Sequence, residues 1–131
     1  MDKEIIEVPV ISDAVRRTGV PLSPVVKANG FVFVSGLPGI DLATGRIVDG
    51  GIEAQTEASL AAVRHALEAA GSSLEKVVKV TIFASNSAWF GRINAIYARY
   101  FGGNAPPART FVAVGSWPLE FDIEIECVAL A

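Results

Sequence analysis

Two charged side chains near the C-terminal end of the chain suggest the chemistry of this protein. Arg109 follows Pro106-Pro107-Ala108, which stiffens the backbone before it, and Glu124 lies in an apolar run. A rigidly mounted guanidinium can grip a planar carboxylate through two parallel hydrogen bonds. A carboxylate beside a dry wall has a raised pKa that suits general acid–base catalysis. The alternatives are an exposed arginine at the start of a strand and an acid on a solvated sheet face.

The two apolar runs around these residues predict strands, Thr110–Gly115 and Phe121–Ala129, separated by a break at Ser116-Trp117-Pro118. In the second run large hydrophobic residues alternate strictly with acids, and this period of two is typical of a strand whose faces differ. If the two runs pair as antiparallel neighbours, Arg109 and an acid converge on one face of a sheet.

Five further residues are weaker candidates for chemistry. Ser35-Gly36 follows a predicted strand and can offer a hydroxyl and a backbone N–H to an anion, or simply make a turn. Asn94 lies on a predicted helix and either reaches a ligand or caps a local backbone group. His65 is the only histidine, so neither a metal site nor a Ser-His-Asp triad is favoured, and we expect a surface residue. Cys127 shares the apolar side of its strand and is expected in the core.

The elements that must position these residues follow from the hydrophobic pattern and the turn signals. Asn29-Gly30 between two apolar runs predicts a hairpin. In the following strand, Phe31–Ser35, the run Phe31-Val32-Phe33-Val34 is continuously apolar, which predicts a strand buried on both faces. The first of two helices is predicted by an inner stripe of residues at three- and four-residue steps: Thr56, Leu60, Val63, Leu67 and Ala70. Gly71 is expected to end this helix as a left-handed cap. The predicted order is strand Ile5–Val10, strand Val25–Ala28, strand Phe31–Ser35, a loop Gly36–Gly51 with a short strand at Arg46–Val48, helix Ile52–Ala70, strand Val77–Ala84, helix Ala88–Phe101 capped by Ser87, and the two C-terminal strands.

The composition favours a single domain (residues 1–131) that buries apolar surface against another subunit. The 131 residues suffice for one core, and they are half apolar with a mean hydropathy of +0.44. Two helices cover only one face of such a sheet, so a second copy of the chain is expected on the other. A net charge of −3 without a basic cluster disfavours a nucleic-acid partner. The sequence predicts neither a membrane span nor a secretory signal, and one cysteine fits a reducing, cytoplasmic compartment.

Several segments resemble the RidA/YjgF family of reactive-intermediate deaminases. PPARTFVAV…WPLEFDIEIECVA is similar to the C-terminal signature of that family, and FVFVSGLPG is similar to its second-strand segment. The helices containing AQTEASLAAVRHALEAAG and RINAIYARYF resemble its two helices. The resemblance spans about Pro24 to Ala129.

The resemblance implies an α+β, chorismate-mutase-like fold with a mixed six-stranded sheet, two helices on one face, and a homotrimer with clefts between subunits. It implies hydrolysis of 2-imino and 2-enamine acids to 2-keto acids and ammonia, without metal or organic cofactor. Arg109 would hold the substrate carboxylate and Glu124 would assist water. Backbone N–H groups of Gly36 and Phe111 would hold the ligand, with Ser35 and Asn94 lining the cleft.

Three residues depart from the family pattern, and they keep other functions open. Val25 replaces a common tyrosine of the cleft, Phe111 replaces a small residue or cysteine, and Trp117 replaces a leucine. Phe111 would narrow the cleft or favour a bulkier apolar substrate. The alternatives are a pathway-specific imine or amide hydrolase in amino-acid or aromatic catabolism, and a non-enzymatic trimer that binds a 2-keto acid.

Overall fold

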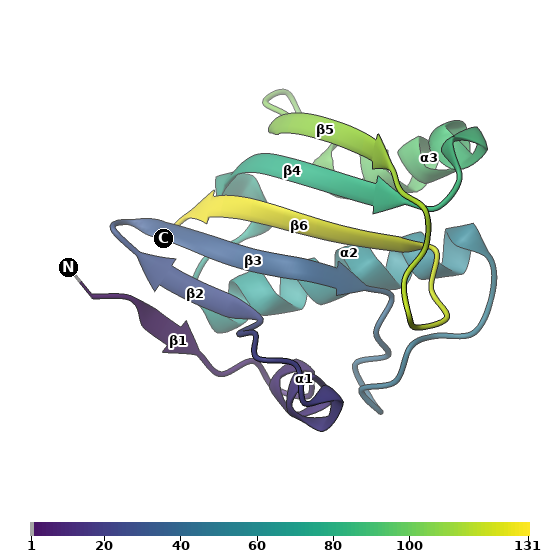
Figure 1. Cartoon of the computed structure of the whole chain (residues 1–131). Coiled ribbons are helices and arrows are strands. Elements are labelled where there is room, and N and C mark those ends of the chain that lie inside the picture. Colours follow the sequence, from purple (N-terminus) through teal and green to yellow (C-terminus); the bar gives the residue numbers. More distant parts are fainter. Residues whose placement is uncertain (1) are drawn as a thin grey trace.

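The computed structural model describes residues 2–131 and consists of a six-stranded sheet with its helices packed mainly behind one face (Figure 1). The strands are β1 (Glu4–Ile6), β2 (Val25–Ala28), β3 (Phe31–Pro38), β4 (Val77–Ala84), β5 (Ala108–Ala113) and β6 (Ile123–Leu130). The helices are α1 (Ile11–Thr18), α2 (Ile52–Ala69) and α3 (Phe90–Phe101), with short 3-10 turns η1 (Leu74–Lys76) and η2 (Ser87–Trp89).

The strands lie in the order β1-β2-β3-β6-β4-β5, and the sheet is mixed because β4 and β5 are parallel while the other neighbours are antiparallel. The predicted mixed six-stranded α+β sheet is confirmed. The expectation that the last two strands are antiparallel neighbours is wrong, since β4 separates β5 from β6. The chain reaches β5 from β4 through α3, and such a crossover joins parallel strands.

The predicted hairpin between β2 and β3 is confirmed, whereas the burial predicted for β3 is wrong for the single chain. Asn29 and Gly30 have φ angles of 52° and 82°, the positive values that the tight turn requires. Val32 is fully buried against the helices, but Phe31 and Phe33 are 37% and 45% exposed on the other face of the sheet. In Figure 1 the face of the sheet toward the viewer carries no helix across it.

The core lies between the sheet and the helices α2 and α3. The inner stripe predicted for the first helix is confirmed, since its members are buried: Thr56, Leu60, Val63, Leu67 and Ala70. From the sheet, β6 contributes alternate residues to the same core: Ile123, Ile125, Cys127 and Ala129. Gly71 has a φ of 78° and gives the helix the predicted left-handed ending.

Helix α3 is tied to α2 by polar contacts that fix where its functional face lies. Arg92 donates to both carboxylate oxygens of Glu53, at 2.6 and 2.8 Å, and the Tyr100 hydroxyl donates to Glu57 Oε1 at 2.7 Å. These contacts are exposed, so each of them contributes little to stability. They nevertheless join α3, which carries Asn94, to α2 behind the sheet. The residue that caps the start of this region is Asn86, whose side chain accepts from Ala88 N, and the predicted cap Ser87 lies inside η2.

The sequence pattern does not predict helix α1, because the apolar run Ile5–Val10 favours one continuous strand. The strand β1 ends at Ile6, Val10 has a φ of 70°, and the chain then turns into the helix. Arg16 in its last turn binds Glu7 and Asp13, each at 2.6 Å. Of the predicted N-terminal segment, Met1 lies outside the described residues.

The end of β3 and the loop that follows it also differ in detail from the prediction. β3 continues to Pro38, and the short strand expected at Arg46–Val48 is a single bridge between Ile40 and Ile47. No helix among residues 2–131 is long and apolar enough to cross a membrane.

Candidate functional site

Arg109 is held on β5 by side chains from α3. Its Nη1 donates to Asn94 Oδ1 at 2.7 Å, and its guanidinium carbon lies 4.8 Å from the ring centre of Tyr97 and 5.5 Å from that of Phe90. Stacking on aromatic rings and one hydrogen bond fix the plane of the guanidinium. Arg109 has five N–H donors, and this is its one side-chain hydrogen bond within residues 2–131. An N–H edge is therefore free to bind a carboxylate.

Phe111 lies on the same side of β5 as Arg109 and contacts the same helix. The two residues pair with Val80 and Ile82 of β4, both fully buried on the helix side of the sheet. The ring of Phe111 meets that of Phe90 edge to face, with centres 5.0 Å apart. Arg109, Asn94 and Phe111 thus lie close together within one chain.

Glu124 lies half-buried on β6, beside a bulge in β3. The pairing of β3 with β6 shifts between Val34 and Leu37, which marks the bulge at Ser35-Gly36. A side chain on Gly36 would begin 2.6 Å from Glu124 Oε1, so it would displace the carboxylate from its present position. Burial raises the pKa of Glu124 and the nearby charge of Glu126 raises it further, while Trp117 opposes the rise as a hydrogen-bond donor. The raised pKa is that expected of a general acid–base group.

Arg109 and Glu124 do not share a face of the sheet. Arg109 pairs with Val80, which points toward the helices, whereas Glu124 pairs with Phe83, which points to the open face. Their predicted convergence through antiparallel pairing is therefore wrong. A single chain presents the guanidinium and the carboxylate as two separate half-sites.

Ser35 and Val25, two of the predicted ligand contacts, are engaged within the fold. The Ser35 hydroxyl donates to Ser23 O at 2.7 Å, and its backbone N–H donates to Pro24 O at 2.9 Å. Val25 pairs with Val34 and is 0% exposed. The expectation that Val25 lines the cleft is wrong for the single chain, because its side chain is buried in the core. Gly36, the third predicted contact, lies next to the carboxylate of Glu124.

His65 and Cys127 take up the places that the sequence predicted for them. His65 Nε2 lies 2.9 Å from Pro9 O and ties α2 to the turn before α1. Cys127 is 3% exposed, and burial raises the pKa of its thiol to about 12. In the described part of the chain, no three His, Cys, Asp or Glu side chains are grouped so that they could hold a metal ion.

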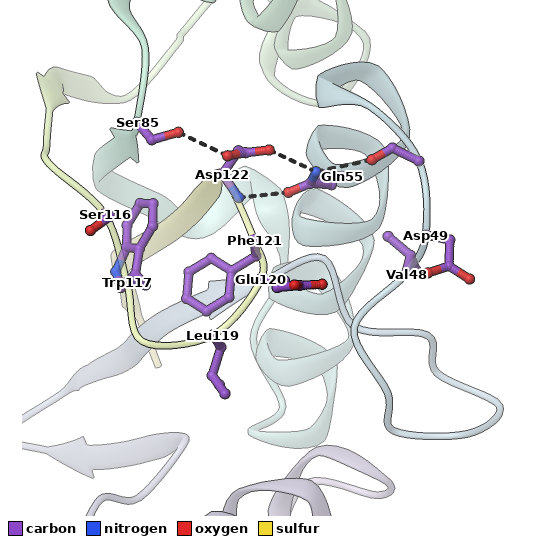
Figure 2. A pocket seen from close by; sticks show the side chains of 11 residues that line it. Val48, Asp49, Gln55, Ser85, Ser116, Trp117, Leu119, Glu120, Phe121 and Asp122 are labelled. Carbon is purple, nitrogen blue, oxygen red and sulfur yellow. Dashed lines mark hydrogen bonds between the residues drawn. The ribbon is translucent and has the colours of Figure 1, made fainter.

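An open hollow of about 450 Å³, which the sequence did not reveal, lies where the loop before β6 meets the start of α2. Figure 2 shows the ring of Trp117 beside that of Phe121, 4.6 Å between centres, and the polar side chains at its floor. Asp122 accepts from Ser85 Oγ at 3.0 Å and from Gln55 Nε2 at 3.2 Å, and its backbone N–H donates to Gln55 Oε1 at 2.8 Å. This network fixes the loop that carries Trp117, because it ties Asp122 at the end of that loop to Gln55 on α2, 67 positions earlier in the chain.

Replacing Gln55 by alanine is expected to lower the free energy of unfolding by about 1–3 kcal/mol. Gln55 is 5% exposed, and its loss would leave the carboxylate and the backbone N–H of Asp122 without these partners. Urea unfolding followed by circular dichroism measures the change. Ser116→Ala, at the exposed rim of the same hollow, is the control and should change stability by less than about 0.5 kcal/mol. Equal stabilities for the two variants would contradict the structural role of the network.

This chain is similar to known proteins both in its sequence and in its structure. A family model described as Endoribonuclease L-PSP matches residues 14–131. A RutC family protein of Pyrococcus horikoshii is 43% identical over 109 residues, which cover 83% of this chain and 86% of that protein. The chloroplastic Reactive Intermediate Deaminase A of Arabidopsis thaliana is 42% identical over 109 residues, 83% of this chain and 58% of that protein. The crystal structure of a putative endoribonuclease from Thermotoga maritima is 41% identical, with a TM-score of 0.88 over 100% of this chain and 98% of that one.

Proposed function

Because this chain belongs to the RidA/YjgF family, whose model is described as Endoribonuclease L-PSP, we propose that it is a hydrolytic deaminase of reactive 2-imino and 2-enamine acids. The substrates would include 2-iminopropanoate and 2-iminobutanoate, and the products are the 2-keto acid and ammonia. The observation that carries the proposal is the Arg109 guanidinium, which Asn94 and two aromatic rings hold with an N–H edge left for a carboxylate.

The reaction needs few groups because an imine carbon is already electrophilic. With the substrate carboxylate on Arg109, water attacks the imine carbon while Glu124 accepts a proton from it. That proton passes to the nitrogen and gives a carbinolamine. Glu124 then takes the proton of the new hydroxyl and delivers it to the amino group, so that the C–N bond breaks, ammonia leaves and the keto group forms. The raised pKa of Glu124 supports both steps, since the carboxyl group must accept and release a proton.

The complete site requires more than one chain, and we propose the homotrimer of a chorismate-mutase-like fold. Arg109 and Glu124 face opposite sides of one sheet, so a cleft holding both would join Arg109 of one copy to Glu124 of another. The open face is also apolar and exposed, with Phe31, Phe33 and Leu130 on neighbouring strands. Exposed patches of this kind are typical of contacts between subunits.

Phe33→Asp is expected to convert a trimer of 13.8 kDa chains into monomers. Phe33 is 45% exposed in the middle of the open face, and a buried unpaired carboxylate at a subunit contact would be strongly destabilising. Sedimentation equilibrium measures the mass. Val20→Asp, at 51% exposure in the loop after α1, is the matched control and should stay trimeric. A monomeric wild type, or a trimeric Phe33→Asp variant, would contradict the assembly.

The deaminase activity is tested by competition with semicarbazide. An amino-acid oxidase generates 2-iminopropanoate from alanine, and semicarbazide traps the imine that survives. We expect the wild-type protein to lower the yield of semicarbazone in proportion to its concentration. The same yield with native protein, heat-denatured protein and buffer would refute the proposed function.

A second candidate function is binding of a 2-keto acid without turnover. It is favoured by the fact that the Arg109 half-site is assembled within one chain while Glu124 lies on the other face. Calorimetry that detects keto-acid binding by a protein inactive in the semicarbazide assay would support it. RNA cleavage is less favoured, because the net charge is −3 and the single histidine contacts the carbonyl of Pro9. The cytoplasmic location stays a prediction, since one relative is named as chloroplastic.

A further inference from the structure

We propose that Phe90 and Phe111 form an apolar wall beside Arg109 and make the site selective for 2-imino acids with an aromatic or large aliphatic side chain. The proposal rests on the function proposed above, and it concerns which substrates that site prefers.

Phe90 contacts both Arg109 and Phe111. Its ring lies under the guanidinium of Arg109, with the ring centre 5.5 Å from the guanidinium carbon, and it also meets the ring of Phe111 at 5.0 Å and 89°. Arg109 and Phe111 are two residues apart on the same side of β5. The group that would bind the carboxylate and the two rings are therefore neighbours on one surface.

The rings of Phe90 and Phe111 are both partly exposed to solvent. Phe90 remains 45% exposed although it contacts both Arg109 and Phe111, and Phe111 is itself only half-buried. An apolar ring left in water next to a carboxylate anchor gains from being covered by the apolar part of a ligand. A substrate such as 2-iminopropanoate has only a methyl group to offer, whereas the side chain of a phenylalanine-derived imine can cover a ring.

The position of the Phe111 ring argues against the alternative that this ring blocks large substrates. The edge-to-face contact holds the Phe111 ring against Phe90, which restrains it from folding over the guanidinium. Asn94, the polar neighbour, is engaged by Arg109. The surface next to the anchor therefore favours apolar substituents over polar ones.

The test compares imines made in situ from phenylalanine, leucine and alanine in the semicarbazide assay. We expect kcat/KM to be about tenfold or more higher for the phenylalanine-derived imine than for the alanine-derived one. Phe111→Ala should lower kcat/KM for the phenylalanine-derived imine about tenfold relative to that for the alanine-derived imine. Phe90→Ala should cause the same loss of selectivity and should also lower the rate with the alanine-derived imine, because Phe90 supports the guanidinium of Arg109. Val20→Ala, at 51% exposure after α1, is the control and should change neither rate.

Other results would overturn the inference. If Phe111→Ala raises the rate with the large imine, the ring blocks the site; if either alanine variant loses its assembly in sedimentation, the rings are a subunit contact. Calorimetry with phenylpyruvate and pyruvate separates this inference from the deaminase proposal. A protein that hydrolyses no imine but binds phenylpyruvate more tightly supports the wall and refutes the deaminase. Hydrolysis with equal rates and equal affinities for large and small ligands refutes the wall alone.

Discussion

Replacing Arg109 by lysine is expected to lower kcat/KM for 2-iminopropanoate about 100-fold or more. Lysine keeps the charge but loses the planar fork that binds both carboxylate oxygens and stacks on Tyr97 and Phe90. Breaking one partner of such a pair typically costs about 2–5 kcal/mol, and each 1.4 kcal/mol is tenfold. The semicarbazide assay, at several substrate concentrations, gives the rate and the KM.

Two further variants show whether this loss comes from orientation of the guanidinium. Asn94→Ala removes the hydrogen bond to Arg109 but keeps the arginine, so a smaller loss of about tenfold is expected, mainly in KM. Arg92→Lys changes an exposed arginine on the same helix, bound to Glu53, and should leave the rate unchanged. An Arg109→Lys variant that is as active as Arg92→Lys would contradict the role of Arg109 as the carboxylate anchor.

The elements that were predicted correctly have patterns that are local in the sequence. The stripe from Thr56 to Ala70 repeats every three or four residues, and the alternation along β6 fixes which of its side chains are buried. Helix α1 also carried local signals that were missed, since Asp13 stands in its first turn, Arg16 and Arg17 in its last, and Gly19 follows with a φ of 73°. The apolar residues before it drew the prediction toward a longer strand.

The order of the strands was not predictable from the same kind of pattern. The segments that became β5 and β6 are separated by a short break, which is typical of a hairpin. In the structure β6 enters between β3 and β4, and β5 is left at the edge. Long-range pairing decides this order, and it also decides that Arg109 and Glu124 face opposite sides. The sequence predicts which residue types form the site, but it does not predict on which face of the sheet each of them lies.

The partners of Arg109 did have a signal in the sequence. Phe90, Asn94 and Tyr97 are spaced by four and three residues, so a helix places them on one face. Tyr97 belongs to the buried stripe of α3 and is only 8% exposed, yet its ring also supports the guanidinium. The contact between Gln55 and Asp122 had no comparable signal, because it joins two polar residues 67 positions apart.

Replacing Glu124 by glutamine is expected to lower kcat about 10²- to 10⁴-fold while leaving 2-keto-acid binding nearly unchanged. Glutamine keeps the shape of the side chain but can neither accept nor release the proton that the reaction moves. The guanidinium of Arg109, which is proposed to bind the ligand carboxylate, is untouched because it lies on the other face of the sheet. Single-turnover rates and calorimetry measure the two effects separately, and a fully active Glu124→Gln variant would refute proton transfer by this residue.

The pH dependence of the wild type gives an independent test of the same assignment. Glu124 must be ionised to accept a proton, and its pKa is raised above 4.5, mainly by burial and further by Glu126. The rate should therefore fall with decreasing pH at a value above 4.5. Glu126→Gln removes the neighbouring charge and should move this fall to lower pH without abolishing the activity. Gly36→Ala should lower the rate, because the new Cβ would begin 2.6 Å from Glu124 Oε1.

Stability should change with pH in the direction set by the same raised pKa. Above the usual pKa of glutamate the folded chain retains the Glu124 proton more than the unfolded chain does, so stability is lost as pH rises through the folded pKa. Glu124→Gln removes this loss. We therefore expect the variant to melt at a higher temperature than the wild type at neutral pH, with the difference disappearing as pH falls toward 4.5. A gain of stability that is the same at both pH values would show that the burial of the charge is not its cause, and would leave Glu124 without the dry surroundings that its proposed chemistry requires.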